Sequence, residues 1–254
     1  MSPRRATFRF YAELNDLLPR RLRHRDFDHE FRGAPAIKDV IESLGVPHPE
    51  IELVLVNGEP RGFEHHLQDG DRVSVYPMFE SVDVSGEVRL RPAPLRDPRF
   101  VLDVHLGKLT ANLRLLGFDC DYDAGREDED LARRSADERR TLLTRDRQLL
   151  KRVVITRGYW VRSQQPEEQA AEVLRRFDLT GIAAPFTRCL RCNGPLTRAI
   201  LDEHAARIPE GVRPRISELT LCEACGRLYW KGTHYERLKL RAEEILRRAG
   251  LPSG

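Results

Sequence analysis

Four of the five cysteines in this chain form two pairs with the spacing of a zinc site. One pair is Cys189 and Cys192, the other is Cys222 and Cys225, and 29 residues lie between the pairs. Two residues between paired cysteines let both sulfur atoms reach one ion, and two such pairs complete a tetrahedral four-thiolate site. A closed set of four ligands leaves no open coordination position, so we predict structural Zn2+ rather than a catalytic metal.

Disulfide bonds are the alternative for these cysteines. The chain starts MSPRRATFRF, which lacks the apolar core and the cleavage site of a signal peptide. We therefore expect a cytoplasmic protein, in which disulfides are rare. No run of about 18 apolar residues is present, so no membrane span is expected. Cys120 stands alone and is predicted to be a small buried residue, and His234 is not needed as a ligand once four cysteines hold the ion.

Three aspartates lie at the ends of predicted strands or at the start of a predicted helix, which is typical of a metal-dependent active site. Asp103 follows the apolar strand RFVL, Asp146 follows the strand TLLT, and Asp128 begins the helix DEDLARR. The carboxyl ends of parallel strands are where open α/β folds gather their sites. Converging carboxylates favour a hard cation such as Mg2+ or Mn2+, which can assist hydrolysis of a phosphodiester.

Each of these acids also has a purely structural interpretation. Asp128 and Asp146 could cap a helix or a turn, whereas a charge at Asp103, inside FVLDVHL, would be penalised without a partner. Asp130 or Glu127 could take the place of Asp128. Two cations near the acids are candidate phosphate contacts that could equally just balance the carboxylates, namely Lys108 and Arg145.

The elements that position these residues fall into three predicted domains. Residues 1–82 read as strands around one helix, with an Asn57–Gly58 hairpin turn, and predict a β-grasp domain. Residues 83–98 hold three of the prolines and are predicted to be a linker. Residues 99–182 alternate strands with helices, which predicts an α/β domain with a mostly parallel sheet and helices on both faces. Residues 183–254 contain the zinc ribbon and a C-terminal helix.

The last segment is mildly basic and mixes aromatic side chains with cations. It carries 13 of the 43 basic residues against 8 of the 40 acidic ones, in a chain of net charge +3. Aromatic side chains beside cations can stack on bases and contact phosphates, which makes Trp230 and Lys231 candidate substrate contacts. The alternative is that Tyr229, Trp230 and Tyr235 cover the zinc ion and pack on the neighbouring domain.

The first segment resembles a known carrier in its second half. VNGEPRGFEHHLQDGDRVSVYP is similar to the closing half of the ubiquitin-like sulfur carriers of thiamin and molybdopterin synthesis. Those carriers end in a free Gly-Gly, whereas this chain continues through FESVDVSGEVRL. We therefore do not expect sulfur carriage, and two roles stay open for this domain: docking of a protein or substrate, and stabilisation of the fold.

Five motifs in order carry a second resemblance, which spans residues 99–240. They resemble the RNase domain named for the C-terminal part of the mut-seven exonuclease, and they are FVLDVHLGKLTANLRLLGFD, Asp128-x-x-Leu131, TLLTRDRQLLKR, FTRCLRCNGPL and CEACGRLYWKGTHYERL. That family has a PIN-like nuclease fold with an appended zinc ribbon, and in bacteria it often follows a ubiquitin-like domain. The resemblance implies metal-dependent RNA cleavage, with Asp103, Asp128 and Asp146 as the acids. A fourth acid has no counterpart after TLLTRD, and His105 stands where an apolar residue is expected.

The sequence therefore predicts a ribonuclease that uses Mg2+ or Mn2+ and carries structural Zn2+, with RNA as its substrate. A protein partner could bind through the β-grasp domain. The alternative is a non-catalytic module that binds RNA or the ribosome, in which the β-grasp domain serves for docking. It predicts RNA binding that survives EDTA and no cleavage with any metal.

Overall fold

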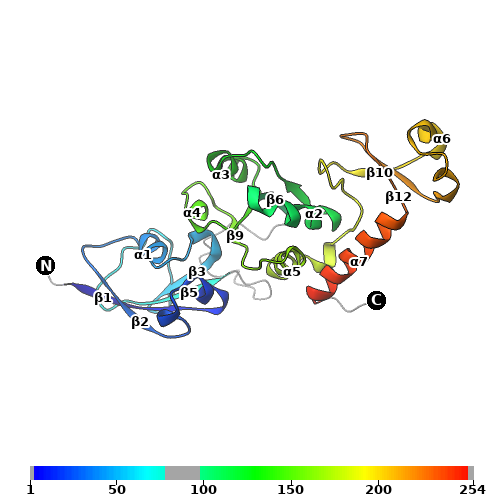
Figure 1. The fold of residues 1–254 in the computed structure, drawn as a ribbon. Coiled ribbons are helices and arrows are strands. Elements are labelled where there is room, and N and C mark those ends of the chain that lie inside the picture. The colour runs from blue at the N-terminus through cyan, green and yellow to red at the C-terminus, as the bar shows by residue number, and fades with distance from the viewer. Residues whose placement is uncertain (1–2, 78–97, 251–254) are drawn as a thin grey trace. The chain divides into compact units, whose positions relative to one another are not determined.

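The computed structural model describes residues 3–77 and 98–250 (Figure 1). Two compact units make up the chain. The first contains residues 1–97 and 127–160, and the second contains residues 98–126 and 161–254. The predicted linker, residues 83–98, lies outside the described residues apart from Pro98. The predicted nuclease segment, residues 99–182, contributes to both units.

The first unit begins with a β-grasp domain whose sheet has the strand order β2-β1-β5-β3-β4. β1 and β5 pair in parallel, and the other neighbours are antiparallel. The Asn57–Gly58 turn joins β3 to β4 with both residues at positive φ, as the hairpin prediction requires. The elements are β1 Arg4–Phe10, β2 Phe27–Phe31, α1 Ile37–Ser43, β3 Ile51–Val56, β4 Glu59–Pro60 and β5 Arg72–Pro77.

The core of this domain lies between its sheet and α1. Alternate residues of β1 point inward, so that Phe8 and Phe10 are fully buried while Arg5 is exposed. Ile37 and Ile41, one helical turn apart on α1, complete the same core. Trp160, from the end of the unit's last strand, packs against it as well.

The rest of the first unit is a short α/β segment. It consists of α3 Asp128–Asp137, β8 Thr141–Thr144, α4 Arg147–Leu150 and β9 Gly158–Trp160. All four residues of β8 are buried, and the strand pairs in parallel with β9. Asp146 sits between β8 and α4, at the carboxyl end of the strand.

The second unit contains another parallel pair, β6 Arg99–Leu102 with β7 Asp119–Asp121. Between these strands, α2 Gly107–Leu115 and its two flanking residues bury one apolar face, which consists of Leu106, Leu109, Leu113 and Leu116. Gly117, at φ +93°, follows this helix. α5 Pro166–Arg176 packs against both α2 and the long C-terminal helix α7 Thr233–Arg248.

The ribbon of the second unit is a three-stranded antiparallel sheet in the order β10-β11-β12. Its strands are β10 Leu196–Ala199, β11 Leu219–Cys222 and β12 Leu228–Trp230, and the short helix α6 Leu201–His204 follows β10. The cysteine pairs lie in turns at the ends of these strands. The predicted α/β class, with parallel strands flanked by helices, is confirmed. Among the described residues, no helix is long and apolar enough to cross a membrane.

Candidate metal centre and predicted catalytic residues

Both cysteine pairs lie in turns of the same construction. In the first turn the Cys189 N–H donates to the Gly194 carbonyl, and the Asn193 N–H donates back to the Cys189 carbonyl. In the second turn the Cys222 N–H donates to the Arg227 carbonyl, and the Gly226 N–H donates back to the Cys222 carbonyl. The residue after each second cysteine has positive φ, +68° at Asn193 and +69° at Gly226. Asparagine and glycine are the residues that tolerate this conformation most readily.

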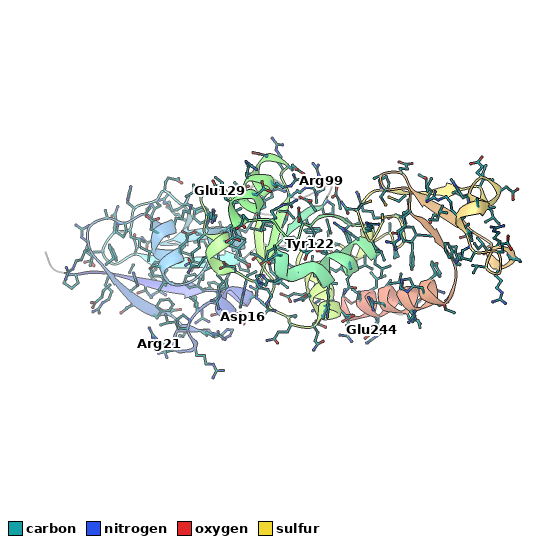
Figure 2. The ribbon with its side chains drawn as sticks, turned by 45° about the horizontal axis from the view of Figure 1, so that its top comes forward. Asp16, Arg21, Arg99, Tyr122, Glu129 and Glu244 are labelled. Atoms are coloured by element: carbon teal, nitrogen blue, oxygen red, sulfur yellow. The ribbon has the colours of Figure 1, made fainter. Side chains whose placement is uncertain are left out.

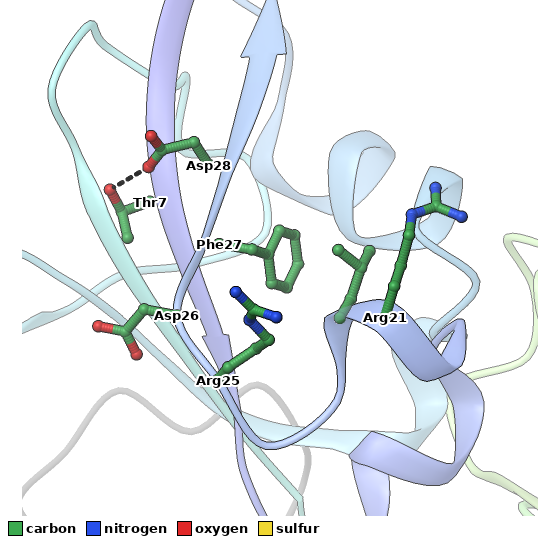
Figure 3. A pocket seen from close by; sticks show the side chains of 7 residues that line it. Thr7, Arg21, Arg25, Asp26, Phe27 and Asp28 are labelled. Carbon is green, nitrogen blue, oxygen red and sulfur yellow. Dashed lines mark hydrogen bonds between the residues drawn. The ribbon is translucent and has the colours of Figure 1, made fainter.

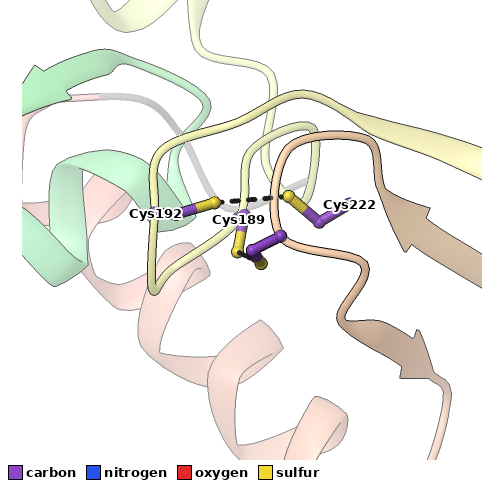
Figure 4. A group of neighbouring side chains, drawn as sticks. Cys189, Cys192 and Cys222 are labelled. Atoms are coloured by element: carbon purple, nitrogen blue, oxygen red, sulfur yellow. Dashed lines mark hydrogen bonds between the residues drawn. The ribbon is translucent and has the colours of Figure 1, made fainter.

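The four sulfur atoms of these turns lie within 4.8 Å of one another (Figure 4). Cys189 Sγ is 3.7 Å from Cys225 Sγ, and Cys192 Sγ is 3.4 Å from Cys222 Sγ. A tetrahedral zinc ion with Zn–S bonds of about 2.3 Å needs sulfur separations of about 3.8 Å. None of the four cysteines forms a disulfide bond. A Cβ on Gly194 would come within 3.0 Å of Cys222 Sγ, so the absence of a side chain there gives the sulfur room. The donor set therefore fits Zn2+.

Hydrogen bonds to one sulfur prepare it for metal binding. The Tyr229 hydroxyl lies 3.0 Å from Cys189 Sγ. Burial raises the pKa of Cys189, but the hydrogen bonds from Tyr229 and from backbone N–H groups outweigh it and lower that pKa to about 6. Desolvation and the neighbouring thiols raise the pKa of Cys192 to about 12. Hydrogen bonds therefore favour the thiolate at Cys189, whereas the surroundings of Cys192 favour the thiol.

The first cysteine turn is fastened to strand β7 by polar side chains. Arg114 of α2 is 6% exposed, and its guanidinium donates to the carbonyls of Cys120, Leu190 and Arg191 at 2.8–3.2 Å. Asn193 donates to Asp119 Oδ1 at 2.7 Å and accepts the Cys120 N–H at 3.0 Å. The first cysteine turn is therefore held to β7 by side-chain hydrogen bonds as well as by the covalent chain.

Asp103 is held at the end of β6 by the turn that follows it. Its side chain is 6% exposed, and Oδ1 accepts the His105 N–H at 2.6 Å and lies 2.9 Å from His105 Nδ1. Tyr122, which Figure 2 labels, donates its hydroxyl to the Val104 carbonyl at 2.9 Å. A Cβ on Gly107 would come within 2.8 Å of that hydroxyl, so glycine permits this close approach. A buried carboxylate destabilises the fold unless it has hydrogen-bond partners, and the His105 turn supplies them to Asp103.

Asp146 and Asp128 lie in the other unit and are both exposed. Asp146 Oδ1 accepts the Gln148 N–H at 2.7 Å and so caps α4, while the Asp146 N–H donates to Thr144 Oγ1 at 2.9 Å. Asp128 is the first residue of α3. The Asp146 side chain is exposed although it caps α4. Hard oxygen donors of this kind suit Mg2+ or Mn2+.

The remaining predicted site residues are placed as follows. Lys108 is exposed in the first turn of α2, and Arg145 is exposed directly before Asp146. Lys231 forms an ion pair with Glu218 at 2.8 Å and lies 5.9 Å from the centre of the Tyr235 ring. Trp230 is half-buried at the end of β12. Within the described part of the chain, the group of metal-ligating side chains that gathers within 4.8 Å is the four cysteines, without His234.

One open pocket lies on the β-grasp domain and holds none of the predicted site residues (Figure 3). Its volume is about 520 Å³. Thr7 Oγ1 donates to Asp28 Oδ1 at 2.9 Å inside it, and Asp26 forms ion pairs with Arg9 and Arg72. The lining residues are Thr7, Arg21, Leu22, Arg25, Asp26, Phe27 and Asp28. Charges of both signs meet there, so the pocket favours neither an anion nor a cation.

Two family models match this chain and together cover most of it. Residues 98–242 match the Mut7-C RNAse domain, and residues 4–83 match the Mut7-C ubiquitin domain. No curated protein matches the chain. The predicted order of a ubiquitin-like domain followed by an RNase domain is confirmed.

Proposed function

Because this chain belongs to the Mut7-C RNAse domain family, we propose that it is a ribonuclease that needs a divalent metal ion. Asp103, Asp128 and Asp146 would hold one or two Mg2+ or Mn2+ ions. The observation that carries the proposal is the buried Asp103 carboxylate, which the His105 turn fixes at the end of a parallel strand. Carboxyl ends of parallel strands are where sites form in α/β folds.

The metal would supply a nucleophilic water at neutral pH and would neutralise the charge that develops on the phosphate. The protein side chains perform the other tasks. Arg145 directly precedes Asp146, and Lys108 follows Asp103 in the first turn of α2. Both are exposed cations that would balance the phosphate charge of the bound RNA. The ribbon, with Trp230 and Lys231, would contact the RNA beside the cleaved bond. The β-grasp domain would in addition dock a protein partner.

Cleavage of end-labelled single-stranded RNA with Mn2+ or Mg2+ tests this proposal. We expect metal-dependent cleavage by the intact protein, and a loss of at least about 100-fold in kcat/KM for Asp103→Asn and for Asp146→Asn. Asp137→Asn is a matched control, because Asp137 is an exposed acid at the end of the helix that Asp128 begins. This control should cleave like the unmodified protein.

Two results would overturn the proposal. Cleavage by the double variant Asp103→Asn/Asp146→Asn at the normal rate would show that these two acids take no part in the reaction. RNA that is bound but never cut, with EDTA or with any metal, would identify the chain as a non-catalytic RNA-binding module. The position of His105 against Asp103 Oδ1 is the observation that favours this second function, because that oxygen already has partners.

A further inference from the structure

We propose that the β-grasp domain positions the Asp146 turn, and that Glu50 and Trp160 are the positioning residues through which it acts. The inference deepens the proposed function and rests on it, since that function gives Asp146 a role in metal binding. All the contacts involved lie in the first compact unit, which joins the β-grasp domain to residues 127–160.

Trp160 contacts the residues on both sides of Asp146. Its indole Nε1 donates to the Arg145 carbonyl at 3.1 Å. The guanidinium of Arg147 lies over the indole ring, 4.3 Å from its centre, in a cation–π contact. Trp160 is also the strand neighbour of Thr144, whose hydroxyl accepts the Asp146 N–H. A single side chain thus fixes the backbone before Asp146 and the side chain after it.

The β-grasp domain in turn fixes Trp160. The Trp160 N–H donates to Glu50 Oε1 at 2.5 Å, and Glu50 is 0% exposed. A fully buried carboxylate is strongly destabilising unless it is hydrogen-bonded, so the fold depends on the hydrogen bonds that Glu50 makes. The Trp160 ring also packs against the hydrophobic core of the β-grasp domain. Its position is therefore set by that domain as much as by strand β9.

The segment that follows Asp146 is held to the same domain at three more points. Arg147 Nη1 donates to the Leu17 carbonyl at 3.0 Å, and Lys151 Nζ donates to the Glu42 carbonyl at 2.6 Å. His48 Nε2 donates to the Ile155 carbonyl at 2.8 Å, while its Nδ1 lies 2.6 Å from Glu42 Oε1. The β-grasp domain therefore forms hydrogen bonds with the chain from α4 to the loop before β9.

The contacts at Trp160 differ from these three because they reach the Asp146 turn itself. The hydrogen bonds of Asp146 are local, to Thr144 and Gln148, and its carboxylate is exposed. Its direction is therefore set by the backbone from Arg145 to Arg147, which Trp160 holds. Partners that orient a metal ligand commonly change metal affinity by about 10–100-fold. A change of metal affinity therefore distinguishes a positioning role from a role in fold stability alone.

The test compares variants of the full zinc-loaded chain by two measurements. One is hydrogen exchange at the amides of Asp146 and Gln148, and the other is the Mn2+ concentration that gives half-maximal RNA cleavage. Trp160→Phe removes the indole N–H but keeps a ring beneath Arg147. We expect exchange about tenfold faster, and a Mn2+ midpoint about tenfold higher with little change of kcat at saturating Mn2+. Glu50→Ala should behave in the same way, and Glu50→Gln, which retains an acceptor oxygen, should restore both values.

Lys151→Met is the matched control, because it breaks one β-grasp contact of the same segment without touching Arg145 or Arg147. It should lower the melting temperature and leave both measurements unchanged. Normal exchange at Asp146 and Gln148 in Trp160→Phe, or equal effects in Lys151→Met, would overturn the positioning role. If the unmodified protein cuts no RNA, the proposed function fails, and the exchange measurement still decides whether the β-grasp domain orders this turn.

Discussion

Two joints attach small domains to the α/β segments of this protein, and they use different chemistry. In the ribbon joint, Arg114 and Asn193 connect the first cysteine turn to β7. In the β-grasp joint, Glu42, His48 and Glu50 hold the segment from α4 to β9. The ribbon joint binds backbone carbonyls whose positions depend on the cysteine cluster. The β-grasp joint needs no metal, because buried side chains and the Trp160 ring hold it.

This difference implies that the stability of the ribbon joint depends on bound metal, whereas the stability of the β-grasp joint does not. A four-cysteine site contributes its metal-binding free energy to folding only when the metal is bound. A joint made of buried hydrogen bonds is stable whenever the surrounding core is folded, and it is lost when one partner is removed. Metal removal and mutation should therefore affect the two joints independently.

The largest effect is expected from loss of the metal site. Cys222→Ser removes a buried ligand, and structural zinc sites contribute about 10 kcal/mol or more to the folding of small domains. We expect zinc content to fall from one ion per chain toward none, and the Cys120 N–H of β7 to lose its protection from hydrogen exchange. The Trp160 N–H, in the β-grasp joint, should keep its protection.

Cys120→Ala is the control for this experiment, because Cys120 is buried outside the cluster. Elemental analysis should still find one zinc ion per chain in that variant. Full protection of the Cys120 amide in metal-free Cys222→Ser protein would show that the ribbon joint does not depend on zinc, and the comparison would be wrong.

Arg114→Ala should produce the next largest effect, with zinc still bound. The guanidinium makes four hydrogen bonds to three backbone carbonyls. Its removal leaves buried acceptors without donors, and we expect a loss of about 3 kcal/mol in the free energy of unfolding of this unit. Urea unfolding followed by circular dichroism at fixed zinc concentration measures it. Arg114→Lys should recover part of the loss, since an ammonium reaches fewer of these carbonyls. A change below about 0.5 kcal/mol, the size typical of surface positions, would contradict the joint.

Parts of both joints could be predicted from local sequence. The spacing of the cysteines specifies their cluster, because two residues between ligands leave the chain few other ways to bring sulfur atoms together. Alternation in β1 and the leucine spacing of α2 likewise indicate which faces are buried. Asp103 and Asp146 were expected at the ends of strands, and they lie there.

The contacts that make the joints could not be predicted in this way. Arg114 is hydrogen-bonded to residues 76 and 77 positions away, and nothing in the helix pattern around it distinguishes it from an exposed arginine. Glu50, in HPEIELVLV, has the pattern of a surface acid before a strand, yet it is fully buried. Its burial follows from the packing of the β-grasp domain on Trp160, which lies 110 residues away. Tertiary packing of this kind leaves no local periodicity.

In the β-grasp joint, His48→Ala should have a smaller effect that is independent of zinc. It leaves the Ile155 carbonyl and the mostly buried Glu42 carboxylate without their partner, and we expect a loss of about 2 kcal/mol. His66→Ala is the control, because His66 is exposed and bonds only within the β-grasp domain. Combined with Arg114→Ala, the two losses should add, since the two side chains share no partner. A coupling above about 0.5 kcal/mol would show that the joints are not independent.

The smallest expected effect concerns the hydroxyl of Tyr229 and appears as a change in pH dependence. The pKa of Cys189 is about 6, below the usual value, because hydrogen bonds including that of Tyr229 outweigh the effect of burial. A donor to the sulfur stabilises the thiolate against protonation, so Tyr229→Phe should raise this pKa and let protons compete better with zinc. Zinc release during acidification, followed with a chromophoric chelator, should then begin at a pH higher by less than about one unit. Tyr235→Phe should not shift the release, because the Tyr235 ring packs on Phe186 rather than on a cysteine. A shift to lower pH in Tyr229→Phe would mean that the hydroxyl weakens the metal site, contrary to the geometry of the ribbon joint.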